Sequence, residues 1–290
     1  MTTSTRTGRS ASGAKLPRLS RPVGDTDVSR GIEASGIRVV FGSLVALDEV
    51  DLVVPPGSIV GLVGPNGAGK TTLLAVLSGI LRPQRGRVTF AGQEITGLSP
   101  QVRAAMGITR TFQQPALFAG MTVREHLLLA HRMRHAPRRI WGDFATFRAL
   151  RSSTVDGAEA ARVDGLLDRL GLANVAEQIV DRLPLGHARL VEVGRALASE
   201  PHTVLLDEPA SGLDGTETAQ LRSVLEGFSS EQGVAFLLID HDVETVLGVS
   251  SAVTVLDFGR VLAHGRPQDV AADPIVREAY LGSVAFGGSA

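Results

Sequence analysis

The amino-acid sequence predicts an α/β fold with a parallel-sheet core, an antiparallel β lobe and an inserted helical subdomain. The core is predicted by four short apolar runs that are continuous rather than alternating, with helical stretches between them. Strands buried on both faces of a parallel sheet have this pattern. The runs cover residues 59–63, 204–206, 235–239 and 253–256.

The antiparallel lobe is predicted by residues 32–54, where apolar and polar side chains alternate up to the turn formed by residues 55–57. Such alternation is typical of strands with one buried face. We expect a second pair of strands around residues 87–95. The alternating apolar positions are Ile37, Val39 and Phe41 in one stretch and Val50, Leu52 and Val54 in the next.

The helical subdomain is predicted between about residues 115 and 198, where leucines recur at helical spacing and breaks fall near Pro137 and Gly171. Residues 1–31 are rich in Ser, Thr, Arg, Gly and Pro without periodicity, which indicates a disordered tail. We expect one folded domain over residues 32–284 and a short C-terminal tail over residues 285–290.

Composition excludes several classes of function. The 290-residue chain has no cysteine, which rules out thiol catalysis, disulfides and Cys-ligated metal sites. No apolar run reaches the roughly 18 residues that a membrane-spanning helix needs, so we expect no transmembrane segment. A formal net charge of −1 gives no support for a nucleic-acid partner.

A glycine-rich loop between a strand and a helix is the strongest motif in the chain. It follows the apolar run at 59–63 and opens a predicted helix at 71–78, for which Gly79 supplies a C-terminal cap. This arrangement directs backbone amides and the positive end of the helix at one point, where phosphate oxygens bind. The loop comprises Gly64, Pro65, Asn66, Gly67, Ala68, Gly69, Lys70 and Thr71, with Thr72 after it.

The loop predicts a nucleoside triphosphate site and a P-loop NTPase (RecA-like) core. Lys70 would reach the β and γ phosphates, and the Thr71 hydroxyl would ligate Mg²⁺. The chain uses arginine for almost all of its positive charge, and its only lysines are Lys15 and Lys70. A compact ammonium fits between phosphates where a planar guanidinium fits poorly. A glycine-rich turn without a ligand is the alternative, and the strand and helix around the loop argue against it.

Acidic side chains and a histidine follow two of the predicted parallel strands. Asp207 and Glu208 come at the end of the strand at 204–206, and His241 follows the strand at 235–239. Ligands bind beyond the carboxyl ends of such strands, so these side chains should lie beside the phosphate loop. We expect Asp207 to hold Mg²⁺ through its water shell, and Glu208 to act as the general base toward water. His241 could hydrogen-bond the γ phosphate, although a histidine at a strand end is often only structural.

In order and spacing, the chain resembles the ABC transporter ATPases over about residues 32–284. Within that superfamily it is most similar to the ATPase subunits of branched-chain amino acid uptake systems, and the ATPases of urea uptake and lipopolysaccharide export resemble it nearly as well. The residues that carry the resemblance are Phe41-Gly42, Ala46-Leu47, the loop at 64–71, Arg110-Thr111-Phe112-Gln113, Leu183 to Arg195, Asp207-Glu208-Pro209, Ser211 to Asp214, His241 and Asp273 to Gly282.

The resemblance implies roles for further residues. Phe41 would stack on the adenine ring, unless it is a core aromatic residue. Gln113 would touch Mg²⁺ and the attacking water, although the neighbouring Gln114 leaves that register open. Asp214 would lie at the interface between two cassettes, which sandwich two ATP molecules between them.

The family also implies partners and a location. Permease subunits would span the membrane, a periplasmic or extracellular solute-binding protein would deliver the solute to them, and the ATPase would sit on the cytoplasmic face of the inner (plasma) membrane. The transported solute is set by the permease and the binding protein, so the ATPase sequence does not reveal it.

The signature motif departs from the family pattern Leu-Ser-Gly-Gly-Gln. Here it reads Leu183-Pro184-Leu185-Gly186-His187, so Leu183 and Gly186 remain while the serine hydroxyl is absent. In the family, that serine donates to the γ phosphate of the opposite site. One interpretation is a heterodimer with one strong and one weak ATP site, and the other is harmless variation.

Two further function classes stay open. A soluble ABC ATPase of DNA repair or translation would carry a long coiled-coil insert or a second cassette, and the sequence contains neither. A nucleotide-binding regulatory subunit without hydrolysis is the other alternative, and the presence of Glu208 and His241 argues against it.

Overall fold

The computed structural model describes residues 31–113, 115–135 and 155–281. Almost all of the predicted N-terminal tail, the predicted C-terminal tail, the break near Pro137 and Gln114 therefore lie outside the described residues. Within the described part, no helix has the length and apolar character to cross a membrane.

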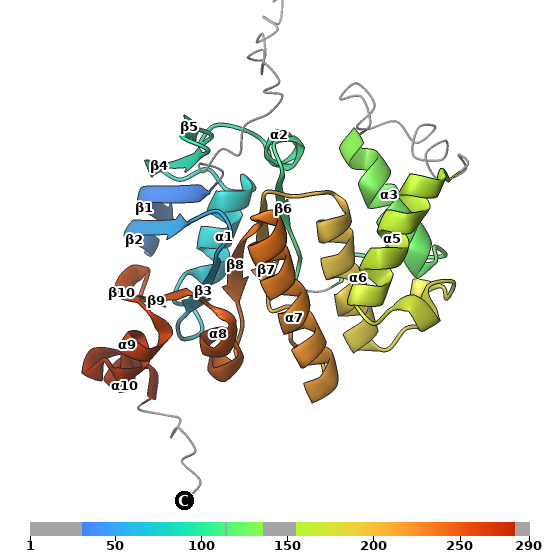
Figure 1. Cartoon of the computed structure of the whole chain (residues 1–290). Coiled ribbons are helices and arrows are strands. Elements are labelled where there is room, and N and C mark those ends of the chain that lie inside the picture. Colours follow the sequence, from blue (N-terminus) through green and yellow to red (C-terminus); the bar gives the residue numbers. More distant parts are fainter. Residues whose placement is uncertain (1–30, 114, 136–154, 282–290) are drawn as a thin grey trace, which may run out of the picture.

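A six-stranded sheet forms the centre of the molecule in the order β10-β9-β3-β8-β7-β6 (Figure 1). The five strands from β9 to β6 are parallel, and only β10 at the edge is antiparallel. This confirms the parallel core predicted from the four apolar runs. The strands are β3 (Ile59–Val63), β6 (Ile108–Arg110), β7 (Thr203–Asp207), β8 (Ala235–Ile239), β9 (Ala252–Asp257) and β10 (Arg260–Gly265).

A four-stranded sheet with antiparallel pairs lies beside this core in the order β2-β1-β4-β5. The alternation seen in the sequence is confirmed, because Ile37, Val39 and Val50 are fully buried on its inner face. The second strand pair also forms where it was predicted. The strands are β1 (Ile32–Phe41), β2 (Leu44–Val54), β4 (Arg85–Phe90) and β5 (Gln93–Glu94).

Helices cover both faces of the parallel sheet. Helix α1 (Lys70–Ser78) forms where the sequence predicts a helix and packs between the two sheets, and its Leu73, Leu74 and Leu77 are completely buried there. The opposite face is covered by helices α6 (Leu185–Ala198), α7 (Gly215–Gln232) and α8 (Val243–Val249), which complete a second apolar core. The smaller helices are α2 (Pro100–Ala105), α9 (Pro267–Ala272), α10 (Pro274–Leu281) and the 3₁₀ turns η2 (Ala173–Val175) and η3 (Val180–Arg182).

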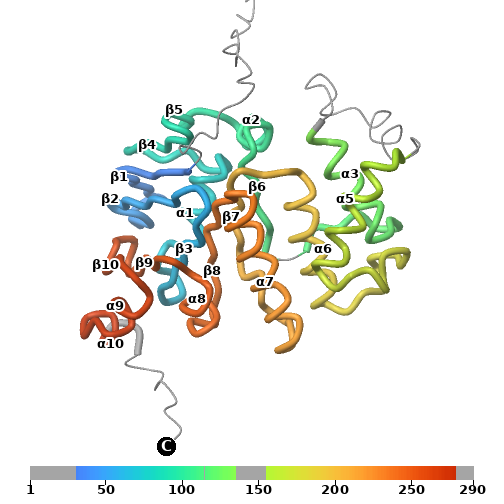
Figure 2. The backbone as a smooth tube through the Cα atoms, viewed as in Figure 1, coloured from blue at the N-terminus to red at the C-terminus, as the bar shows by residue number. Residues whose placement is uncertain are grey.

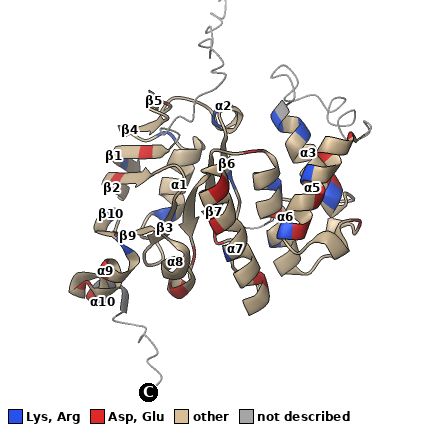
Figure 3. Ribbon diagram, viewed as in Figure 1, with Lys and Arg blue, Asp and Glu red and all other residues tan. Residues whose placement is uncertain are grey.

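Helices α3 (Val123–His135) and α5 (Gly157–Arg169) pack with α6 at the end of the molecule opposite the antiparallel sheet (Figures 1 and 2). This helical layer lies in the stretch predicted at residues 115–198. Charged side chains gather on α3, α5 and α6, while the parallel strands are almost free of them (Figure 3). The layer therefore presents a charged outer surface and an apolar inner one.

Candidate active site

The glycine-rich loop runs from the end of β3 into α1, as predicted. Gly67 and Gly69 have φ angles of 83° and 105°, in the left-handed region that favours glycine. Helix α1 ends at Gly79, whose φ of 81° makes the predicted C-terminal cap. The loop thus has the backbone conformation needed to wrap around an anion at the start of a helix.

The Lys70 ammonium is held inside this loop. Its Nζ donates hydrogen bonds to the carbonyl oxygens of Gly64 at 2.5 Å and Pro65 at 2.9 Å. Burial lowers the pKa of Lys70, and the nearby carboxylates of Glu208 and Asp207 partly offset that effect. The partners of the ammonium are neutral carbonyls, so the cation retains positive charge for an anionic ligand.

Glu208, His241 and Gln113 come together from three separate segments beside the loop. Oε1 of Glu208 lies 2.7 Å from Nε2 of His241, and Nε2 of Gln113 lies 3.4 Å from both carboxylate oxygens. Glu208 directly follows β7 and has a φ of 52°, which turns its side chain out of the strand direction. Glu208 and His241 therefore meet at the carboxyl ends of β7 and β8, where the sequence places them, and Gln113 joins them from the segment after β6.

Asp207, the last residue of β7, is buried and paired with an arginine that sequence reasoning missed. Its Oδ2 lies 3.0 Å from Nη2 of Arg110, and its backbone N–H donates to the Thr111 hydroxyl at 3.1 Å. Arg110 ends β6, a three-residue strand paired with β7. The signal was available in the Arg110-Thr111 pair before Gln113, but β6 is too short to be recognised from its apolar pattern.

A cavity of about 650 Å³ is lined by the phosphate loop together with Gln113, Glu208 and His241. Its wall also includes the apolar side chains of Phe41, Leu44, Val45 and Phe258. Phe41 is 51% exposed, so it is not a core aromatic residue. Leu44, Val45 and Phe258 could not be placed at the cavity from the sequence, because exposed apolar side chains near turns have no distinctive pattern.

The cavity and its donors fit a nucleotide with a hard divalent cation. The apolar side chains suit a flat base, and the left-handed loop with Lys70 suits phosphates. Hydroxyl, carboxylate and amide oxygens are the ligand types that Mg²⁺ takes. Thr71 and Gln113 supply a hydroxyl and an amide on the cavity wall, whereas the carboxylate of Asp207 lies behind that wall and is paired with Arg110.

A buried carboxylate that the sequence did not predict ties two of the site's loops together. Asp240 is 4% exposed, and its oxygens accept the backbone N–H groups of Ala210 at 3.1 Å and Asp242 at 3.2 Å. Burial raises the pKa of Asp240. The segment after Glu208 is thereby fixed relative to His241.

The signature segment begins helix α6 and does not line the cavity. Leu183 packs partly against the core, Pro184 occupies the N-cap without a side-chain hydrogen bond, and Leu185 is 55% exposed. A Cβ atom on Gly186 would lie 2.4 Å from a carboxylate oxygen of Glu217, so a larger residue here would require the Glu217 side chain to move.

Asp214 caps helix α7 rather than lining the cavity. Its carboxylate accepts the Glu217 N–H at 2.8 Å, and the Glu217 carboxylate accepts the Asp214 N–H at 2.9 Å. This reciprocal pair is a capping box, which satisfies two backbone donors at the start of the helix.

A phosphate loop at the start of a helix, with an acidic pair and a histidine at neighbouring strand ends, defines a nucleotide-hydrolysing ATPase of the P-loop class. A family model described as "ABC transporter" matches residues 47–211. A second model, described as "Branched-chain amino acid ATP-binding cassette transporter", matches residues 260–285. The chain belongs to the ATP-binding cassette family of ABC transporters.

Known relatives agree with this assignment. The high-affinity branched-chain amino acid transport ATP-binding protein LivG of Escherichia coli K12 is 36% identical over 253 residues, which cover 87% of this chain and 97% of LivG. BraF of Pseudomonas aeruginosa, which carries the same functional description, is 36% identical over 264 residues, or 91% of this chain and 99% of BraF. A crystal structure of an ABC transporter cassette in its ADP conformation has a TM-score of 0.74 and 29% identity, covering 87% of this chain and 99% of that one.

Proposed function

We propose that this chain is the ATP-hydrolysing subunit of an importer for branched-chain amino acids, and that separate permease subunits carry the solute. Two relatives that align over nearly their whole length bear that description, and the C-terminal family match at residues 260–285 supports it independently. The folded unit that performs this work is residues 32–284.

The observation that carries the hydrolytic role is the contact between Glu208 and His241 beside the phosphate loop, at 2.7 Å. Glu208 takes a proton from the attacking water as general base, and His241 orients that carboxylate and contacts the γ phosphate. Gln113 positions the water from the other side of Glu208, from which its amide nitrogen is 3.4 Å away. Gln113 rather than Gln114 is therefore our choice for the site glutamine.

Nucleotide binding falls to the loop and to the apolar side chains of the cavity wall. Residues 64–72 surround the phosphates with backbone amides, Lys70 neutralises the β and γ phosphates, and Phe41 stacks on adenine. Thr71, Asp207 and Gln113 would hold Mg²⁺, which would neutralise phosphate charge during hydrolysis. Arg110 lies 3.0 Å from the Asp207 carboxylate and orients it.

The partner of this chain is a second cassette. Leu183, Gly186 and Asp214 lie outside the cavity of their own chain, which supports a role toward the nucleotide of the partner. Because Pro184 provides no hydroxyl, we propose a heterodimer with one strong and one weak site, and a homodimer in which Pro184 is harmless variation is the alternative. The pair docks on permease subunits at the cytoplasmic face of the inner membrane, and a solute-binding protein takes part only through those permeases.

The function is tested in two steps with the Glu208→Gln variant. We expect kcat for ATP hydrolysis to fall by about 10²- to 10⁴-fold, the usual contribution of a general base, with ATP affinity unchanged. Ser230→Ala, at an exposed position on α7, is the matched control. Hydrolysis by Glu208→Gln at the rate of the control would refute the catalytic assignment.

The solute is tested with the permease subunits that copurify with the chain. In proteoliposomes, we expect ATP-dependent uptake of labelled leucine, isoleucine and valine with wild type and none with Glu208→Gln. Uptake of another solute class, with none of these three, would refute the substrate while leaving the ATPase assignment intact.

A further inference from the structure

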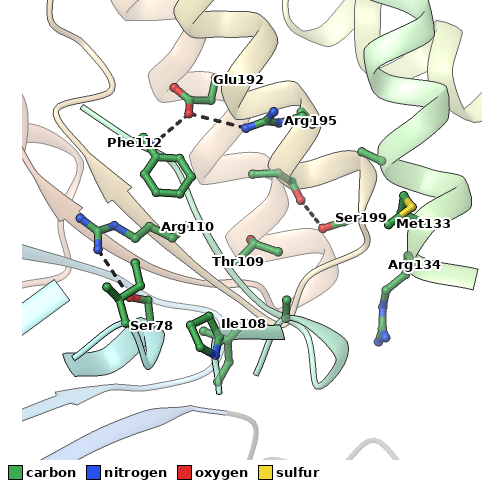
Figure 4. Close-up of a pocket in the computed structure, with 15 residues that line it drawn as sticks. Ser78, Ile108, Thr109, Arg110, Phe112, Met133, Arg134, Glu192, Arg195 and Ser199 are labelled. Carbon is green, nitrogen blue, oxygen red and sulfur yellow. Dashed lines mark hydrogen bonds and ion pairs between the residues drawn. The ribbon is translucent and has the colours of Figure 1, made fainter. Parts of the chain in front are cut away.

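A second cavity separates the catalytic core from the helical layer, and a buried carboxylate lies on its wall. The cavity has a volume of about 320 Å³ and lies between helices α1 and α2 with strand β6 on one side and helices α3 and α6 on the other (Figure 4). Glu192, on helix α6, is 2% exposed. Burying an ionisable side chain is costly unless a specific partner compensates for the loss of water.

The partner of Glu192 is the backbone of the segment that ends in Gln113. Oε1 of Glu192 accepts the N–H of Phe112 at 2.9 Å and lies 3.7 Å from Nη2 of Arg195, one helical turn further along α6. Figure 4 shows the carboxylate between these two groups. Burial raises the pKa of Glu192, and the bond from Phe112 and the charge of Arg195 act against that rise.

The segment is held from its other side by the catalytic core. Arg110 pairs with Asp207 at 3.0 Å, and its guanidinium lies 5.7 Å from the centre of the Phe112 ring. Residues 110–112 are thus fastened to β7 through Arg110 and to α6 through Glu192. Gln113 is the next residue, and it reaches Glu208 only at 3.4 Å, near the limit of a hydrogen bond.

We propose that Glu192 is a positioning residue for hydrolysis, because its carboxylate anchors the Phe112 backbone to the helix that carries the signature segment and so sets how far Gln113 reaches toward Glu208. Helix α6 starts at Leu185, within the signature segment, so a displacement of that helix is passed to Gln113 through one hydrogen bond. The inference rests on the role proposed for Gln113.

Two conservative variants separate the reach of the side chain from its charge. Glu192→Gln keeps an acceptor oxygen at the same distance and removes the charge. Glu192→Asp keeps the charge and shortens the side chain by one methylene group, which withdraws it from the Phe112 N–H. If Glu192 acts by holding the Phe112 N–H, the Glu192→Gln variant should behave like wild type and the Glu192→Asp variant should not.

We expect Glu192→Asp to lower kcat for ATP hydrolysis by tenfold or more with KM for ATP within twofold of wild type, because residues 64–71 are untouched. Glu192→Gln should stay within threefold of wild type in both constants. Val193→Ala, buried on the same helix, is the control for a purely structural defect. It should lower thermal stability without changing kcat.

Hydrogen exchange gives a readout that does not depend on hydrolysis. We expect the Phe112 amide to exchange at least tenfold faster in Glu192→Asp than in wild type or Glu192→Gln. Equal exchange rates in all three proteins would refute the proposed role of Glu192. Loss of activity in Glu192→Gln but not in Glu192→Asp would refute it as well. A Gln113→Ala variant with wild-type kcat would instead overturn the role of Gln113, on which the inference depends.

Discussion

Replacing Arg103 tests whether a buried guanidinium holds the helix of the phosphate loop in place. Arg103 lies on helix α2, is 1% exposed, and donates to backbone carbonyls from three neighbouring segments. Burial lowers the pKa of Arg103 to about 10. The acceptors are Val76 at 2.7 Å, Leu77 at 2.6 Å, Ile95 at 2.8 Å, Thr96 at 3.1 Å and Leu98 at 3.3 Å.

The number of hydrogen bonds made by Arg103 determines how much stability its replacement should cost. Each of these hydrogen bonds contributes a net stability of about 1 kcal/mol, so Arg103→Met should lower the free energy of unfolding by about 5 kcal/mol. Arg103→Lys keeps the charge, but an ammonium has three donors, so at least two carbonyls lose their partner and the loss is about 2 kcal/mol or more. A typical domain has about 5–15 kcal/mol in total, so the first variant is close to unfolding.

Urea unfolding at neutral pH, followed by far-UV circular dichroism, measures both losses. Arg222→Met is the control, because the exposed Arg222 on α7 forms a surface pair with Glu226, and such pairs contribute about 0–1 kcal/mol. A loss for Arg103→Met within 1 kcal/mol of that control would refute the reasoning, since it would mean that water replaces the guanidinium at every carbonyl.

Three further predictions follow from single positions. Gly69→Ala places a Cβ atom 2.7 Å from the Ala46 carbonyl oxygen at a φ of 105°, so affinity for a fluorescent ATP analogue should fall about tenfold or more. Gly165→Ala is the control, because the space around Gly165 is open, and this variant should bind the analogue normally. Equal affinities of the two variants would contradict the prediction. His126 accepts the Phe118 N–H, and burial lowers its pKa below 6.5. The ring therefore takes up a proton in the unfolded chain before it does so in the folded one, and stability should fall as pH drops below about 6.5. The melting temperature of His126→Gln should lack this part of the dependence on pH, and identical dependences for variant and wild type would refute the prediction. Pro184→Ser supplies the missing N-cap acceptor of helix α6 and should raise the free energy of unfolding, measured by urea titration, by about 1 kcal/mol. An unchanged free energy of unfolding would show that the start of the helix needs no cap.

The sequence predicted those parts of the site that depend on the ends of strands. Asp207 and Glu208 directly follow one fully apolar run, His241 follows another after a single residue, and the carboxyl ends of neighbouring parallel strands meet at one edge. The phosphate loop was predictable for a similar reason, because a strand, a glycine-rich turn and a helix follow one another without interruption. Local pattern and topology agree at these positions, so little long-range information was needed.

The parts that the sequence did not reveal depend on which polar groups become buried together. Arg103 and Glu192 lie on amphipathic helices, where a charged residue is usually solvated, and nothing in their spacing indicates a backbone partner. Asp240 directly precedes His241, and nothing in the sequence indicates that its buried carboxylate joins two loops. Such contacts are set by tertiary packing, which a single sequence encodes only indirectly.

Three buried charged side chains each hold a backbone segment that carries part of the active site. Arg103 holds the end of the helix that begins with Lys70, Asp240 holds the segment after Glu208, and Glu192 holds the backbone before Gln113. For Asp240 and Glu192, the partner is a backbone group within two residues of a catalytic side chain. For Arg103, the partners include backbone groups at the far end of the helix that begins with Lys70. Buried charged side chains that bond to backbone groups give direction and fixed distance, which apolar packing alone does not provide. Catalytic groups whose positions relative to water and phosphate must be correct to within about 0.5 Å need such support, and this is where the chain pays the desolvation cost of burying charge.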